Sequence, residues 1–120
     1  MAVELRPSQA LRLLHELALT QVRDQVRDTA PDLSQRQLGV LTTIYLESPP
    51  HTVRGLAARL GVTKPVITRA LDTMGELGLV ARRRDEADRR NVVIQRTVEG
   101  ALYLERLGDL VVAVARGLPR

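Results

Sequence analysis

Arginine side chains are concentrated in the second half of this 120-residue sequence, where they could bind an extended anion. Residues 54–96 hold ten basic and five acidic residues, a net charge of +5, whereas the rest of the chain carries −1. A guanidinium group donates hydrogen bonds in a fixed plane, which suits paired phosphate oxygens. The segment therefore predicts a polyanion-binding face, although a solvated surface in an arginine-rich proteome would have the same composition.

The densest arginines lie immediately before and within one short charged stretch. They are Arg82, Arg83, Arg84, Arg89 and Arg90. Residues 85–90 are all charged except Ala87, which predicts the solvent-exposed tip of a hairpin between two short strands. Like charges on adjacent strands repel each other, and a nearby phosphate backbone would relieve that repulsion. An arginine at such a tip also suits the negative potential of a narrow minor groove.

A second polar set lies on one side of a helix predicted to begin at Thr63. Apolar residues recur at helical spacing at Ile67, Ala70, Leu71, Met74 and Leu77. The opposite face is left to Lys64, Pro65, Thr68, Arg69, Asp72 and Thr73. Lysine and arginine can bind phosphate or guanine O6 and N7, and threonine can contact a base edge or a thymine methyl group. Because every amphipathic helix has a polar outer face, this helix alone is weak evidence for binding.

Other kinds of chemistry find little support. The chain has no cysteine, which excludes disulfides and thiolate metal sites. The two histidines could not form a metal site without carboxylate ligands, and their surroundings do not suggest such a site. We find no nucleophile–base pair or glycine-rich phosphate loop, so we predict no enzyme, metal or cofactor. Two tyrosines, with no phenylalanine or tryptophan, argue against binding of single-stranded nucleic acid.

The sequence has no feature that directs it to a membrane. No apolar run reaches the roughly 20 residues that a membrane span needs. Arg12, His15 and Glu16 interrupt the leucines near the N-terminus, which is unlike a signal peptide. We therefore expect a cytoplasmic protein.

Period and capping signals predict the elements that would position these side chains. The expected helices begin at Ser8, Ser34, Thr52, Thr63 and Thr97, and the expected strands span 79–84 and 91–96. Ser34 and Gln37 form a capping box, while Gly61 and Gly78 are expected to end the third and fourth helices. The result is a mainly α single domain over 1–120 with a small β-hairpin wing (α+β), in the order ααααββα.

The third and fourth helices, joined by a tight turn at Gly61 and followed by the charged hairpin, form a winged helix-turn-helix. A major groove admits one such helix, whose N-terminal residues reach the bases while the preceding helix crosses the backbone. Double-stranded DNA is therefore the predicted partner. The alternative is a winged-helix module for protein contacts, which would predict an apolar outer surface on the fourth helix.

The segment from Leu33 to Leu104 resembles the MarR (multiple-antibiotic-resistance regulator) family of bacterial transcription regulators. The matching stretches are LSQRQ at 33–37, TVRGLAARLGV at 52–62, TKPVITR at 63–69, LGLV at 77–80, DEADRR at 85–90 and TVEG at 97–100. The wing pattern D-x-x-D-R-R followed by T-x-x-G is the specific part, since the turn motif occurs in many families. One departure is Arg96, where the family commonly has leucine.

The resemblance implies a homodimer on a pseudo-palindromic operator, usually a repressor released by a small ligand. Residues 33–97 would be the DNA-reading part, with Asp88 bracing Arg90 so that an arginine can enter the minor groove. Together with the outer face of the fourth helix and the wing, this gives the candidate DNA-binding residues Thr52, Arg54, Thr63, Lys64, Pro65, Thr68, Arg69, Thr73, Arg82, Arg84, Asp88, Arg89 and Arg90.

Two further expectations concern the flanking helices, 8–30 and 98–118, which are the candidate dimerization region. Family members usually extend further at the C-terminus, so dimerization here is expected to rest on the first and last helices. Either the last helix pairs across a two-fold axis, or its apolar residues pack on the first helix of the same chain; they are Leu104, Leu107, Leu110, Val111 and Val114. His15 and Tyr45 are the candidate residues of an effector site, although both can equally be ordinary boundary residues.

Overall fold

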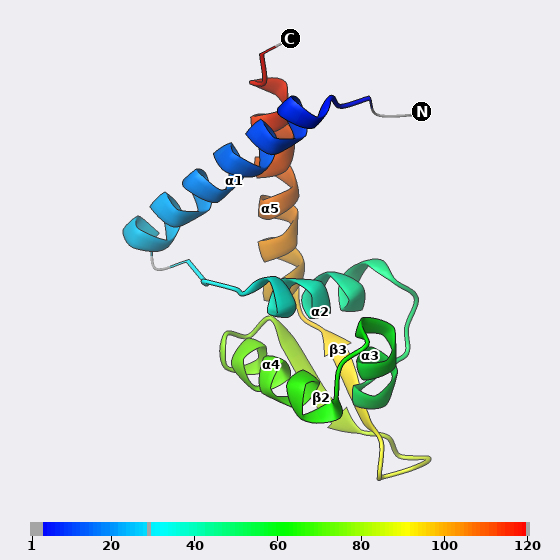
Figure 1. Ribbon diagram of the computed structural model, residues 1–120. Helices are drawn as coiled ribbons and strands as arrows, with labels where there is room; N and C mark the ends of the chain where they lie inside the picture. The colour runs from blue at the N-terminus through cyan, green and yellow to red at the C-terminus, as the bar shows by residue number, and fades with distance from the viewer. Residues whose placement is uncertain (1–3, 29, 120) are drawn as a thin grey trace. The chain divides into compact units, whose positions relative to one another are not determined.

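The computed structural model describes residues 4–28 and 30–119. Its elements are α1 (Pro7–Asp28), α2 (Gln35–Leu46), β1 (His51–Thr52), α3 (Val53–Leu60), α4 (Lys64–Glu76), β2 (Val80–Arg84), β3 (Val92–Arg96) and α5 (Val98–Arg116). The predicted α+β winged helix-turn-helix is confirmed (Figure 1), with β1 as an added strand. Among the described residues, no helix is long and apolar enough to cross a membrane.

The chain separates into two compact units. Residues Leu33–Leu104 form the winged helix unit, and Met1–Asp32 with Glu105–Arg120 form the flanking unit. The described residues leave out 1–3, 29 and 120. The predicted domain over 1–120 includes all of these positions, and the predicted first helix over 8–30 includes position 29. The domain boundaries predicted from the sequence stay predictions.

The sheet of the winged helix unit is antiparallel, in the order β1-β3-β2. Val80 pairs with Arg96 at one end of the hairpin and Arg84 pairs with Val92 at the other. On the far side of β3, His51 pairs with Ile94. The sequence did not predict β1 because a strand of two residues is too short to show a period.

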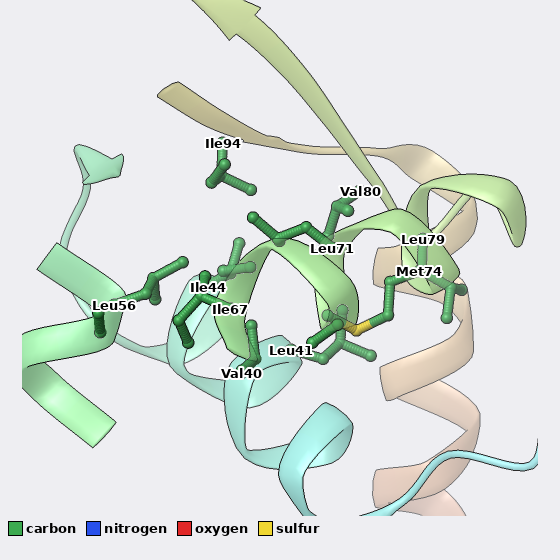
Figure 2. Close-up of a cluster of buried hydrophobic side chains, with 12 residues drawn as sticks. Val40, Leu41, Ile44, Leu56, Ile67, Leu71, Met74, Leu79, Val80 and Ile94 are labelled. Atoms are coloured by element: carbon green, nitrogen blue, oxygen red, sulfur yellow. The ribbon is translucent and has the colours of Figure 1, made fainter. Parts of the chain in front are cut away.

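The core of the winged helix unit is aliphatic, as the shortage of aromatic residues requires. Its buried members are Val40, Leu41, Ile44, Leu56, Ala57, Ile67, Ala70, Leu71, Met74, Leu79, Val80 and Ile94. Figure 2 shows Ile67, Leu71 and Met74 of α4 among side chains from α2, α3 and the sheet. The prediction that Leu77 belongs to this stripe is wrong, because α4 ends at Glu76 and the Leu77 side chain is 43% exposed.

Most predicted helix ends are confirmed. The Ser34 hydroxyl accepts from the Gln37 N–H at 3.1 Å, and the Gln37 side chain accepts from the Ser34 N–H at 2.8 Å. Gly61 and Gly78 have φ values of 69° and 75°, the left-handed conformation that favours glycine. Two details differ. The first helix begins at Pro7 rather than Ser8, since proline is tolerated at the first helical position, and Thr63 precedes α4 without a side-chain cap bond.

The first turn of α5 is held by a close-fitting junction within the winged helix unit. The Tyr45 hydroxyl donates to the Leu79 carbonyl at 2.7 Å and accepts from the Thr97 N–H at 2.8 Å. The Thr97 hydroxyl donates to the Gly78 carbonyl at 2.7 Å and accepts from the Gly100 N–H at 2.9 Å. A Cβ atom at Gly100 would collide with the Tyr45 hydroxyl and the Leu79 carbonyl oxygen. This junction therefore requires glycine at position 100.

Arg96 supports the C-terminal end of α2. Its Nε donates to the Ile44 carbonyl at 2.8 Å, and a terminal nitrogen donates to the Glu47 carbonyl at 3.0 Å. The guanidinium also lies 5.8 Å from the centre of the Tyr45 ring. The last carbonyls of a helix lack partners within the helix, so arginine here performs a capping role that leucine could not.

The flanking unit is built differently. None of its described side chains is buried, and Leu11, Leu14 and Val26 of α1 are 68%, 61% and 79% exposed. Near its two ends, the Gln9 side chain donates to the Pro119 carbonyl at 3.4 Å. The described residues of this unit therefore form no closed hydrophobic core.

Candidate nucleic-acid interface

The turn between α3 and α4 presents one face of α4 to solvent. After Leu60, Gly61 turns the chain, and the Val62 N–H donates to the Ala57 carbonyl at 3.0 Å. The apolar stripe of α4 then enters the core, as described above. The opposite side is exposed and carries Lys64, Pro65, Thr68, Arg69 and Thr73.

Two cations on this face are available to a ligand. Lys64 and Arg69 are exposed, and the described part of the chain offers neither of them an ion pair or hydrogen-bond partner for its side chain. Since the Thr63 side chain makes no cap bond, the first N–H groups of α4 are also left open toward solvent. Free amides and unpaired cations at the start of one helix suit phosphate. Thr73 contributes less, because its hydroxyl donates to the Arg69 carbonyl at 3.4 Å.

The wing is the β2–β3 hairpin, whose tip extends away from the helices in Figure 1. The tip is shaped by its own carboxylates: Asp85 accepts from the Ala87 N–H at 3.0 Å, and Asp88 accepts from the Arg90 N–H at 3.1 Å. Such local bonds stabilise a turn without any core. These local bonds fix the turn, so the tip can present its arginines at a defined place.

Asp88 also holds the Arg90 side chain. The Arg90 Nε lies 3.2 Å from the Asp88 carboxylate, and the Arg90 side chain is 91% exposed. Hydrogen bonds from the side chain and the backbone of Arg90 lower the pKa of Asp88, and the positive charge of Arg54 lowers it further. The start of α3 thus lies close enough to the wing for its charge to be felt there. Arg54 itself is exposed, whereas the Thr52 hydroxyl is used to cap α3 by accepting from the Gly55 N–H at 3.0 Å.

The arginines of β2 have three different surroundings. Arg82 forms an ion pair with Asp72 of α4 at 2.8 Å, and Arg84 donates across the hairpin to the Arg89 carbonyl at 2.9 Å. Arg83 lies on the other face of the sheet, opposite Val93. The sequence predicted these arginines to act as one cluster and did not predict Asp72 as the ion-pair partner of Arg82. A period of two on β2 was the available signal, because it places Arg82 on the side of buried Val80.

The two effector-site candidates differ in what they can offer a ligand. His15 is an exposed residue of α1 in the flanking unit. Tyr45 belongs to the winged helix unit, and its hydroxyl is occupied by the bonds to Leu79 and Thr97. The described residues contain no group of three histidine, cysteine or acidic side chains that could hold a metal ion.

Fold and surface together define a winged helix-turn-helix protein with a cationic exposed face. A family model matches residues 33–92, half of the chain, and the protein belongs to the MarR family. This is a family of transcription regulators and not of enzymes. The match begins where the sequence resemblance began and ends within β3.

Solved structures show the same fold. YusO from Bacillus subtilis has a TM-score of 0.72 and 20% identity, with 91% of this chain and 72% of that chain covered. MepR of S. aureus, in its DNA complex, has a TM-score of 0.71 and 20% identity, covering 84% and 80%. The PcaV regulator from Streptomyces coelicolor, in complex with its natural ligand, has a TM-score of 0.62 and 25% identity, covering 97% and 81%. No curated protein sequence matched the chain.

Proposed function

We propose that this protein is a sequence-specific regulator of transcription that represses by binding a pseudo-palindromic operator as a homodimer. The observation that carries the proposal is the exposed face of α4, where Lys64 and Arg69 have no side-chain partner among the described residues, beside a wing that presents Arg90. A helix of this kind fits a major groove, and the wing then falls beside the neighbouring minor groove.

Seven of the candidate side chains have a direct role within this proposal. Thr68 and Arg69 read base edges, since they lie on the exposed face within the first two turns of α4. Arg54, Lys64 and Arg89 neutralise backbone phosphates, and Arg90, braced by Asp88, enters the minor groove. The likeness to MepR, which has been solved bound to DNA, supports this arrangement.

The flanking unit supplies the homodimer in this proposal. Exposed aliphatic side chains recur along α1 at Leu11, Leu14, Val22 and Val26. Aliphatic residues at this spacing form a stripe that stays in contact with water unless another helix covers it. A second copy of the chain, related by a two-fold axis, would cover both stripes at once and would set two α4 helices at the spacing of two half-sites.

A small-molecule effector completes the proposal. Support comes from the likeness to PcaV, which has been solved with its natural ligand. His15 and Tyr45 stay the proposed lining residues. Because the Tyr45 hydroxyl is already bonded, Tyr45 can offer a ligand only its ring, next to the guanidinium of Arg96.

Selection from random duplex DNA tests the proposal. We expect an enriched inverted repeat with half-sites about one helical turn apart, and affinity that falls steeply with salt. The protein–DNA complex should contain two protein chains for each duplex. If no sequence is enriched and binding is weak and sensitive to salt, the DNA-reading proposal fails and a protein-contact role takes its place.

The same operator allows a test of base reading at Arg69. Arg69→Ala should weaken specific binding by about 1–3 kcal/mol with little change on random DNA. The matched control is Arg36→Ala, which removes an exposed arginine from α2, outside the proposed interface. An unchanged ratio of specific to non-specific affinity in Arg69→Ala would exclude a base contact.

A further inference from the structure

We infer that Arg82 acts as a positioning residue, held by Asp72, that keeps the wing strand against α4, and that it is not a DNA ligand. The inference rests on the proposed function, and it changes the role that the sequence suggested for Arg82. Its basis is the ion pair of 2.8 Å between Arg82 on β2 and Asp72 on α4.

The strand register explains why Arg82 meets α4. Arg82 pairs with Ile94 on the neighbouring strand, and cross-strand partners share one face of the sheet. Since Ile94 is buried in the core, this is the face against which α4 packs. A Cβ atom at Gly75 would lie 3.9 Å from an Arg82 terminal nitrogen, so the guanidinium extends along α4 from Asp72 toward Gly75.

Exposure separates Arg82 from the arginine at the wing tip. The Arg82 side chain is 35% exposed, whereas that of Arg90 is 91% exposed. Arg82 is therefore folded back onto the protein, while Arg90 extends into solvent. Arg84 is likewise bonded within the hairpin, and Arg89 and Arg90 at the tip are the wing cations to which we assign DNA contacts.

Asp72 would otherwise oppose DNA binding. It is exposed and lies one turn after Thr68 on α4, so an unpaired carboxylate there would repel phosphate. The ion pair with Arg82 neutralises the charge of Asp72. The same pair joins α4 to β2, the two elements that must contact adjacent grooves at the same time. Exposed ion pairs add little to folding stability, so the benefit of this pair lies in the relative placement of α4 and β2.

Binding measurements on Asp72→Ala, Arg82→Ala and the double variant separate this role from a direct phosphate contact. With the full chain and the selected operator, both single variants should weaken specific binding by about five- to tenfold, and the double variant should be no weaker than the worse single variant. The slope of log affinity against log salt should stay unchanged in Arg82→Ala. Asp72→Glu, which retains a carboxylate, should bind nearly as tightly as the unmodified protein.

A phosphate contact at Arg82 predicts the opposite pattern. Arg82→Ala would then lower the salt slope by about one, Asp72→Ala would strengthen binding by removing a repulsive charge, and the two effects would add. Any of these results would overturn the positioning role. The sign of the Asp72→Ala effect is the sharpest readout, because the two roles predict opposite directions.

A measurement without DNA keeps the inference separate from the proposed function. Amide hydrogen exchange in residues 85–91 should be faster in Asp72→Ala and in Arg82→Ala, but not in Asp72→Glu. The matched control is Arg83→Ala, which removes the neighbouring arginine on the opposite face of β2 and should leave exchange unchanged. If the unmodified protein selects no DNA site, the proposed function fails, while unchanged exchange in both alanine variants would overturn the inference itself.

Discussion

The winged helix unit and the flanking unit use similar aliphatic residues with opposite results. In the winged helix unit, twelve hydrophobic residues are buried, from Val40 to Ile94. In the flanking unit, no described side chain is buried, and leucines and valines of α1 remain exposed. The contrast teaches that a helical apolar pattern predicts a contact surface. It does not predict whether residues of the same chain cover that surface.

The two units also differ in net charge. Residues 33–104 contain eleven basic and seven acidic residues, which equals the whole net charge of +4, and the remaining residues are balanced at seven and seven. A neutral unit can associate with a copy of itself without repulsion, whereas a cationic unit favours a polyanion. The division supports a proposed assignment of DNA binding to one unit and self-association to the other.

The largest effect on folding stability is expected at one of two glycines of α5, which lie one in each unit. Gly100→Ala should destabilise the protein by about 1–3 kcal/mol, because the new Cβ would collide with the Tyr45 hydroxyl and the Leu79 carbonyl oxygen. Gly108→Ala should instead stabilise by about 0.5–1 kcal/mol, since nothing lies within 4 Å of its added Cβ and alanine favours helix. Denaturant unfolding measures both, and equal effects of the two changes would contradict the contrast between the units.

Self-association should depend on the flanking unit alone. Leu11→Glu combined with Leu14→Glu should raise the dimer Kd at least about 100-fold (about 2.7 kcal/mol), because each change enters a two-fold interface twice. Leu46→Glu is the matched control, since this leucine is 80% exposed but belongs to the winged helix unit. Sedimentation equilibrium measures both variants. A dimer weakened only by Leu46→Glu would move the interface to the other unit.

A smaller effect is expected at Arg96. Arg96→Leu should cost about 1–2 kcal/mol of unfolding free energy, because the Ile44 carbonyl loses its donor and the Glu47 carbonyl keeps only the His51 ring, 3.1 Å away. The control is Arg83→Leu on the outer face of the sheet, which should change stability little. Urea unfolding compares them. Equal stability of the two variants would show that the cap on α2 contributes nothing.

The smallest effect concerns pH. Hydrogen bonds from Arg90 hold the pKa of Asp88 below its ordinary value, so the stabilisation of the wing turn is present at neutral pH and is lost as pH falls through that lowered pKa. A carbon-detected NMR titration should give a midpoint below the ordinary aspartate range. Arg90→Ala should raise the midpoint more than Arg54→Ala. An unmoved midpoint in Arg90→Ala would exclude the bracing contact.

Local signals in the sequence determined much of the fold. The capping box at Ser34, the left-handed Gly61 and the change of period after Gly78 each depend on residues within a few positions of one another. Together with the wing motif at 85–90, they were enough to predict the winged helix-turn-helix and its resemblance to the MarR family, and both predictions are confirmed. The candidate roles of individual DNA-binding residues stay predictions.

The partners of the polar side chains were decided only by the tertiary structure. Arg82 meets Asp72 because the strand register turns it toward α4, and Arg96 caps a helix that lies about 50 positions earlier in the chain. Tyr45, a candidate effector residue in the sequence, uses its hydroxyl to hold the start of α5. An arginine or tyrosine can reach many partners, and its residue type and neighbours do not choose among them. The choice depends on which backbone atoms and carboxylates packing brings within about 3 Å, and that is a property of the folded chain.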